Sequence, residues 1–287
     1  MKIAFECVPC LIRQSIEAAR MVTDDIAMQQ DIIKKSLKEV SQLNFSETAP
    51  YFARIVHRYI KEVSGNDDPY KSLKVKYNEV AAQICHDFNL HDLIKNSRSP
   101  VDTACRLSIA GNIIDFGVSA LIEEEEVRAS IEECVKTEIE HNMTPELVEA
   151  VHRASKILFI ADNSGEIVFD KLLINELPKE KITYVVKGEP IVNDATMEDA
   201  VEVGMIDLVR VIDNGSDAQG TILDLCSGEF KKEFDEADLI IAKGQANYET
   251  LSELTSKEIF FLLKAKCPSI AEDLQCLQGD LVIKRII

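Results

Sequence analysis

Apolar residues recur with the spacing of helices in the first half of the chain. Between about residues 9 and 151 they repeat every three to four positions, which is typical of amphipathic helices, and strand patterns are missing. Turn-forming clusters at 65–69 and 97–100 divide this region into helix pairs. Thr144-Pro145 combines an N-cap with a first-turn proline and predicts a last helix that runs to about Ser155.

From residue 156 onward the pattern changes to short, unbroken apolar runs separated by helical stretches. Strands buried on both faces lose their alternation, so these runs indicate a mostly parallel sheet with helices on both sides. We therefore predict an α/β fold, with a mainly helical region over 1–150 and a Rossmann-like region over 151–287. The predicted strands are 156–161, 182–187, 207–212, 238–242, 258–263 and 280–285.

Polar residues follow three of these runs at the point where each predicted strand ends. In a parallel sheet, ligands bind beyond the carboxyl ends of the strands, where loops and helix N-termini meet. The three polar ends are therefore expected to meet in one place. They are Asp162-Asn163-Ser164-Gly165, then Lys187-Gly188 with Asn193-Asp194, and Lys243-Gly244-Gln245-Ala246-Asn247.

The first two of these ends carry oxygen ligands suited to a divalent cation. Asp162 and Asn163 are adjacent, and Asp194 would complete an oxygen set for a hard ion. Ser164 and Gly165 would let backbone amides approach a phosphate or carboxylate. The alternative is that Asp-Asn-Ser-Gly is simply good turn and cap chemistry. The convergence of three strand ends favours the metal site.

Lysines at the strand ends are candidate anion contacts. Lys243 is placed to meet an anion beside the metal, whereas Lys187 is a weaker second contact because it precedes a proline turn. Asn247 adds an amide at the same strand end. The alternative for Lys243 is a solvated side chain in a glycine turn.

Asn112 and Asp115 form a further polar pair, located before the sheet region. They are three residues apart, so one turn of helix would point both side chains the same way. Because their neighbours are apolar, these groups need partners. Either they cap helices or they face the site, and the sequence does not choose between these.

Composition excludes several classes of partner. With 50 acidic and 32 basic residues among 287, the net charge is −18 and no basic patch offsets it, so nucleic acid is not expected to bind. No run of about 18 apolar residues could cross a membrane, and no secretion signal is present, so we expect a cytoplasmic protein. Nothing in the pattern predicts an oligomeric state.

The eight cysteines are too sparse for a disulfide framework, and most look like small core residues. Cys7 and Cys10 have redox or metal spacing, but no second pair follows them, so a structural zinc site is not expected. The pair is either a thiol pair near the active cleft or two small buried residues. The five histidines show no pairing, and no Gly-x-Ser-x-Gly or P-loop pattern occurs.

These segments together resemble the metal-dependent damage-control phosphatases, also called the domain of unknown function 89 family, in the branch with an N-terminal Cys-x-x-Cys. The resemblance spans nearly the whole chain, and its motifs occur in the family's order. They are Cys7-Val8-Pro9-Cys10, Gly111-Asn112-Ile113-Ile114-Asp115, Asp162-Asn163-Ser164-Gly165-Glu166, Lys187-Gly188-Glu189-Pro190, Asn193-Asp194-Ala195-Thr196 and Lys243-Gly244-Gln245-Ala246-Asn247.

The resemblance implies hydrolysis of phosphate monoesters of small metabolites, such as sugar phosphates or damaged phosphometabolites. It implies a divalent cation, Mn, Ni, Co or Mg, held by Asp162, Asn163 and Asp194, with Lys243 beside the phosphate. Asn112 would line the cleft, and Asp115 is our candidate to steer the water or protonate the leaving oxygen. The alternatives are a non-catalytic Rossmann-like module that binds a metabolite or nucleotide and, less favoured, a small-molecule methyltransferase.

Overall fold

The computed structural model describes residues 1–111, 131–137 and 139–287, which contain one seven-stranded sheet. The order across the sheet is β1-β7-β6-β5-β2-β3-β4, and every neighbouring pair is parallel except β6 with β7. The predicted α/β fold with a mostly parallel sheet is therefore confirmed. The strands are β1 (Ile139–Glu140), β2 (Ile157–Ile160), β3 (Ile182–Val186), β4 (Arg210–Asp213), β5 (Leu239–Lys243), β6 (Ile259–Lys264) and β7 (Leu281–Ile286).

Helices cover both faces of the sheet, because successive side chains of each strand point to opposite faces. On β2, Ile157 and Phe159 belong to one core and Leu158 and Ile160 to the other. The first core includes residues of α4 (Lys71–Asp87), α5 (Leu90–Lys95), α6 (Pro100–Ala110), α8 (Thr144–Arg153), α9 (Glu166–Asn175) and α10 (Met197–Glu202). The second includes residues of α11 (Gly228–Glu236), α12 (Gly244–Leu251) and α13 (Pro268–Leu274).

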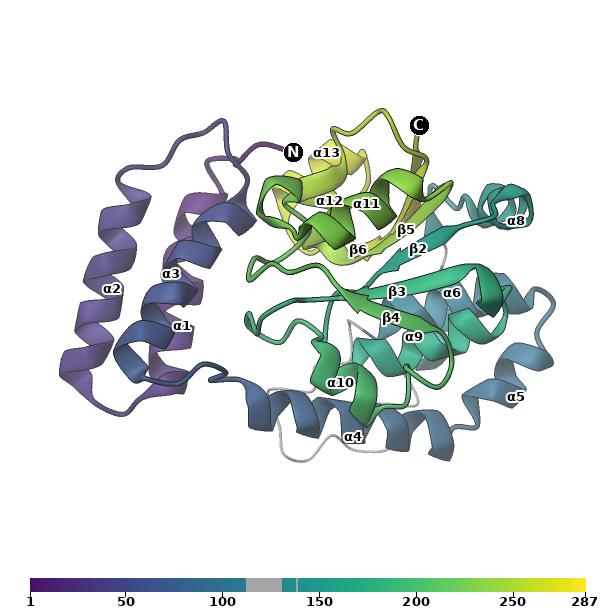
Figure 1. The fold of residues 1–287 in the computed structure, drawn as a ribbon, viewed down its shortest axis with the longest axis horizontal. Helices are drawn as coiled ribbons and strands as arrows, with labels where there is room; N and C mark the ends of the chain where they lie inside the picture. Colours follow the sequence, from purple (N-terminus) through teal and green to yellow (C-terminus); the bar gives the residue numbers. More distant parts are fainter. Residues whose placement is uncertain (112–130, 138) are drawn as a thin grey trace.

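The first three helices form a separate bundle beside the sheet. They are α1 (Cys7–Val22), α2 (Ile26–Val40) and α3 (Ala49–Ser64), and they bury small apolar clusters of their own. Figure 1 shows this bundle, coloured purple to blue, on the left, with α4 running away from it under the sheet. The helices of the N-terminal half therefore occupy two places: α1–α3 in the bundle, and α4–α6 against the sheet.

The expectation that the first 150 residues contain no strand is wrong at one point. Ile139 and Glu140 form β1, which pairs in parallel with Leu281 and Val282 of β7 at the edge of the sheet. A two-residue strand is too short to produce a periodic pattern, so only its tertiary pairing reveals it.

The helix that was predicted to begin at Thr144 is present as α8, although it ends at Arg153, two residues before the expected end. Pro145 occupies its first turn, where the missing amide hydrogen costs nothing. The helices of the described part of the chain are short or amphipathic, and none has the length and apolar content needed to span a bilayer.

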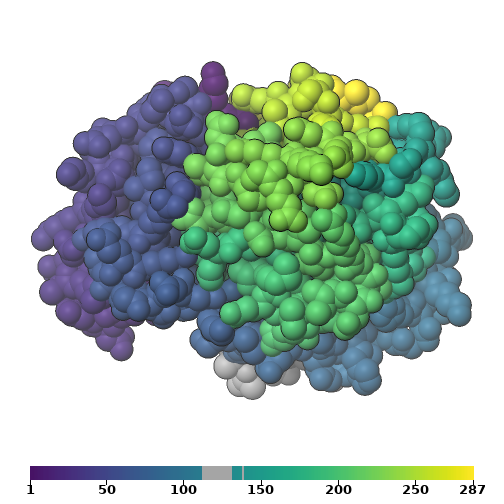
Figure 2. Space-filling model, in the orientation of Figure 1, coloured from purple at the N-terminus to yellow at the C-terminus, as the bar shows by residue number. Residues whose placement is uncertain are grey.

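Helix α3 fastens the bundle to loops that follow the strands. Arg54 and Arg58 both donate hydrogen bonds to the carboxylate of Asp217, and Lys61 donates one to the carbonyl oxygen of Pro190. Charge-assisted contacts of this kind are stronger than neutral hydrogen bonds. Figure 2 shows the result, with the purple and blue bundle packed against the green part of the chain.

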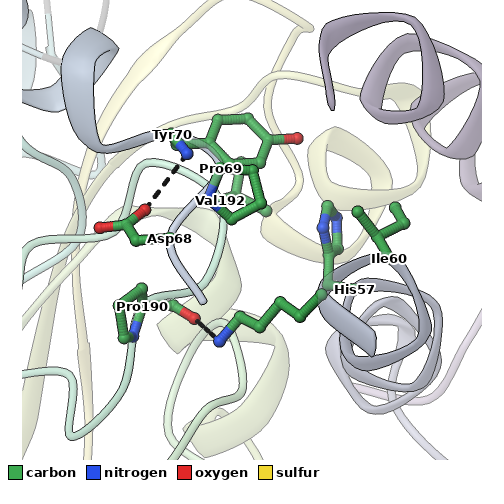
Figure 3. A pocket seen from close by; sticks show the side chains of 8 residues that line it. His57, Ile60, Asp68, Pro69, Tyr70, Pro190 and Val192 are labelled. Carbon is green, nitrogen blue, oxygen red and sulfur yellow. Dashed lines mark hydrogen bonds between the residues drawn. The ribbon is translucent and has the colours of Figure 1, made fainter. Parts of the chain in front are cut away.

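A cavity of about 10 Å³, the size of a single water molecule, lies between α3 and two loops (Figure 3). His57 lines it. The edge of one ring of the His57–Tyr70 pair faces the other ring, with the two ring centroids 6.1 Å apart. Burial, with a smaller contribution from Lys61, lowers the pKa of His57 to about 4. The neutral imidazole is therefore the form that the fold accommodates.

This histidine should make the protein sensitive to acid. In the unfolded chain the imidazole binds a proton at its ordinary pKa of 6.5. The contribution of His57 to the free energy of unfolding is therefore fully present above that pH and is lost as the pH falls toward 4. At pH 5 the expected loss is about 2 kcal/mol. Urea unfolding at pH 7 and pH 5 checks this, since His57→Phe should lose about 2 kcal/mol less than the unsubstituted protein. Equal losses in both proteins would contradict it.

Candidate functional site

A cleft of about 660 Å³ lies between the bundle and the loops at the carboxyl ends of β2, β3, β5 and β6. The bundle contributes residues of α1 and the start of α3, so the two walls of the cleft come from different parts of the chain. The lining residues from the sheet side include Asp162, Asn163, Asn193, Gln219, Gln245, Glu249, Lys266 and Cys267.

Backbone hydrogen bonds join the loop after β2 to the loop after β3. The amide of Ala195 donates to the carbonyl of Asp162 at 2.9 Å, and the amide of Ser164 donates to the carbonyl of Asn193 at 2.8 Å. Asn163 and Asp194 form an antiparallel bridge between the two loops. The structure thus brings together the three residues that the sequence suggested as cation ligands.

Asp162 and Asp194 are both buried, and burial raises the pKa of each carboxyl to about 6. Asp194 raises the pKa of Asp162 further, because two carboxylates close together disfavour each other's charge. Lys187 opposes this: its ammonium nitrogen lies 3.5 Å from Asp194 Oδ2. Gln219 also approaches the Asp194 carboxyl and lowers its pKa, although neither this contact nor that of Lys187 has the full geometry of a hydrogen bond.

These side chains fit a hard divalent cation. Two buried carboxylates close together are costly unless positive charge compensates them, and the ion pair of Lys187 with Asp194 supplies one such charge for the two. Among the described residues, no group of three or more His, Cys, Asp or Glu side chains is arranged to hold a metal. The set found here is two carboxylates and one amide, and amide oxygens are ordinary ligands of hard cations.

Ser164 and Gly165 support the turn instead of lining the cleft. The hydroxyl of Ser164 donates to Asp199 Oδ1 at 3.0 Å, and the amide of Gly165 donates to Asn78 Oδ1 at 2.7 Å. Gly165 has φ +77°, a value that favours glycine. The amide of Gly165 therefore already has a partner within the protein, so its predicted role in substrate binding remains a prediction.

Lys243 and Asn247 are fully buried below the cleft. The ammonium nitrogen of Lys243 contacts Asp170 Oδ1 at 2.6 Å and Glu166 Oε1 at 2.7 Å. Burial disfavours this ammonium, yet the two carboxylates raise the pKa of Lys243 above its usual value. The amide nitrogen of Asn247 donates to the carbonyls of Ala161 and Lys243. Neither side chain lines the cleft, so this placement gives no support to direct contact between Lys243 and a phosphate.

Comparison with known proteins identifies the family. The model of the damage-control phosphatase ARMT1-like domain matches residues 3–282, which is nearly the whole chain. The chain belongs to this family.

Several relatives of the family match over almost their full length. An uncharacterized protein of Methanocaldococcus jannaschii is 41% identical, over 99% of this chain and 95% of that protein. A damage-control phosphatase of Archaeoglobus fulgidus is 38% identical, over 99% of this chain and 99% of that protein. A damage-control phosphatase of Pyrococcus horikoshii is 36% identical, over 99% of this chain and 98% of that protein. A crystal structure of a DUF89 family protein from Pyrococcus horikoshii has a TM-score of 0.90 and 36% identity, with both chains fully covered.

One predicted part of this family member's site lies outside the described residues. Asn112 and Asp115 fall within residues 112–130, so the choice between a capping role and a place in the cleft stays a prediction.

Several cleft residues were not assigned from the sequence. Lys266 follows the end of β6, so the strand-end rule that singled out Asp162 would also have found it. Cys267 also follows β6 and lines the same cleft as Cys7 and Cys10, which places the thiol pair at the cleft, with Cys7 also packed against a hydrophobic cluster of the bundle. Glu166 does not line the cleft: it is buried beneath Asn163, where no pattern in the sequence indicated a role for it.

Gly244, the first residue of α12, approaches Asp162 so closely that only glycine fits. A Cβ there would lie 1.9 Å from Asp162 Oδ2, and the backbone has φ +78°. Gly244→Ala should therefore displace the carboxylate and destabilise the protein by about 1–3 kcal/mol. Urea unfolding checks the value. Gly228→Ala is the control, because a Cβ there meets nothing within 4 Å. Similar losses of unfolding free energy in both variants would contradict the conclusion that only glycine fits beside Asp162.

Proposed function

We propose that the protein is a metal-dependent phosphatase that hydrolyses phosphate monoesters of small metabolites, such as sugar phosphates or damaged phosphometabolites. Membership of the damage-control phosphatase ARMT1-like family, with two relatives named as phosphatases, supports a phosphatase. The observation that supports metal dependence is that Asp162, Asn163 and Asp194 meet where the loops after β2 and β3 join, beside the cleft that Asp162 and Asn163 line, with both carboxylates buried.

The three residues would hold a divalent cation such as Mn, Ni, Co or Mg through oxygen atoms. When bound, the cation would supply positive charge to the phosphoryl group and lower the pKa of a bound water. Asp162 and Asp194 must be deprotonated to serve as ligands. Because burial raises the pKa of each to about 6, cation affinity should rise as the pH increases through that value.

Other groups of the chain would bind and orient the substrate. With a net charge of −18, the protein as a whole repels a phosphate ester, so positive charge has to be local. Lys266 and Arg13 line the cleft on opposite walls and provide it. Gln219 offers a donor and an acceptor for the hydroxyl groups of a polar metabolite, whereas the Gln245 amide is held by Glu249 and by the backbone amide of Lys266.

The test is a phosphatase assay of the purified protein with p-nitrophenyl phosphate across Mn, Ni, Co and Mg, followed by Asp162→Ala and Asp194→Ala. We expect turnover only with a divalent cation and a loss of at least about 100-fold in each variant, because each removes a proposed ligand. Turnover in the presence of a chelator, or undiminished metal-dependent turnover in both variants, would refute the proposal. A panel of phosphorylated metabolites would then rank the substrates.

A further inference from the structure

The amide of Asn163 has a fixed orientation. Its nitrogen Nδ2 lies 2.8 Å from Asp162 Oδ2 and 3.1 Å from Glu166 Oε2. Ionised carboxylates only accept hydrogen bonds, so the atom that faces both of them has to be the nitrogen. Both hydrogens of the amide are thereby directed at carboxylates, and the amide oxygen lies on the other side of the group.

Glu166 is itself held in place from below. It is the first residue of α9, its side chain is 1% exposed, and its second oxygen Oε1 accepts a hydrogen bond from Lys243 Nζ at 2.7 Å. Lys243 Nζ also donates to Asp170 Oδ1 and to the carbonyl of Ser108, so its three hydrogens all have acceptors. A continuous chain of contacts therefore runs from Lys243 through Glu166 to Asn163.

We propose that Glu166 is the positioning residue that keeps the Asn163 amide oxygen turned toward the cation, and that Lys243 acts on the site through Glu166. This inference rests on the proposed function, because the cation is what the orientation serves. Lys243 then acts from a buried position: it contacts Glu166, and Glu166 contacts Asn163, which lines the cleft. Partners of this kind beyond the direct ligands typically change metal affinity by about 10- to 100-fold.

The substitution Glu166→Gln tests the orientation, because it exchanges one acceptor for a donor. Lys243 still requires an acceptor, so the glutamine oxygen turns toward it and the glutamine NH2 faces Asn163. Two donors would then oppose each other, and Asp162 Oδ2 alone would still hold the Asn163 nitrogen. The amide orientation is then no longer fixed, and a flipped form that presents the oxygen to the glutamine and the nitrogen to the cation should become populated. A nitrogen carrying two hydrogens is not a cation ligand.

The measurement is Mn²⁺ binding by calorimetry at pH 7.5, with circular dichroism to confirm folding. We expect Glu166→Gln to weaken Mn²⁺ binding by about 10- to 100-fold. Glu258→Gln is the control: it also removes one carboxylate, but at the amino end of β6, where Glu258 pairs with Arg153. The control should bind Mn²⁺ within about threefold of the unsubstituted protein.

A charge-matched exchange separates orientation from general damage. In the double variant Asn163→Asp with Glu166→Gln, the glutamine NH2 donates to the carboxylate introduced at position 163, and one oxygen of that carboxylate again faces the cation. Its other oxygen lies beside Asp162 Oδ2, a repulsion that the bound cation offsets. We expect Mn²⁺ affinity within about tenfold of the unsubstituted protein, and this variant alone carries the test if Glu166→Gln does not fold. Binding by Glu166→Gln at full affinity, or no recovery in the double variant, would overturn the inference. Absence of Mn²⁺ binding by the unsubstituted protein would instead reject the proposed function.

Discussion

Lys243→Met should lower the free energy of unfolding by about 3–5 kcal/mol, the cost of leaving buried charges without their partner. Lys243 is fully buried and neutralises Glu166 and Asp170. Asp170 also accepts hydrogen bonds from Ser108 and Tyr184, both at 2.7 Å, so it cannot turn to solvent without breaking a buried network. The loss should shrink in mild acid, where Glu166, whose pKa burial raises to about 7, takes up a proton.

Urea unfolding monitored by circular dichroism measures this effect. The matched control is Lys71→Met, because Lys71 also pairs with a carboxylate, Glu198, but both side chains are exposed. Removal of such a surface pair changes stability by about 0–1 kcal/mol. If the two variants lose similar stability, the buried network does not hold the fold as we infer.

Asp194→Asn should separate stability from activity. The folded pKa of Asp194 is raised from 3.8 to about 6 by burial, so the folded state is favoured by protonation. Stability is therefore highest below pH 3.8 and falls as the pH rises through about 6, a cost of about 3 kcal/mol at pH 7. The neutral amide does not carry this cost, and Lys187 keeps its hydrogen bond to the carbonyl of Gly220, so the metal-free variant should be more stable at pH 7, by up to about 2–3 kcal/mol, and unchanged at pH 4.

The same variant should lose at least about 100-fold in metal-dependent turnover, because a neutral amide replaces a proposed anionic ligand. Unfolding in the presence of a chelator at pH 4 and pH 7, together with the p-nitrophenyl phosphate assay, tests both expectations. Asp235→Asn, at an exposed carboxylate, should change neither quantity. A variant that is less stable at pH 7, or one that retains full turnover, would contradict our account of Asp194.

Most of the fold could be predicted from the pattern of apolar residues. Strands such as β2 and β5 are buried on both faces, and this burial requires the unbroken apolar runs that the sequence contains. The two-residue strand β1 was missed because its pairing with β7 depends on a partner distant in the sequence. Nor did helical periodicity distinguish the helices of the bundle from those that cover the sheet, because each type has one apolar stripe.

The site was predicted to a lesser extent, for a related reason. The strand-end rule located Asp162, Asn163 and Asp194, since parallel strands deliver their carboxyl ends to one edge. It could not distinguish a lysine that points into the cleft from one that points into the core. Lys243 is the last residue of β5 and turns inward toward α9, whereas Lys266 lies two residues beyond β6 at the cleft. Side-chain direction depends on packing and cannot be derived from spacing.

The two walls of the cleft rest on separate hydrophobic cores: α1 packs in the bundle, while the acidic loops sit on the sheet. Side chains on α1, such as Arg13 and Gln14, can therefore be exchanged without disturbing the carboxylates on the facing wall. Related proteins can therefore diverge in which metabolite they accept through changes on α1, while the carboxylates on the facing wall are inherited unchanged.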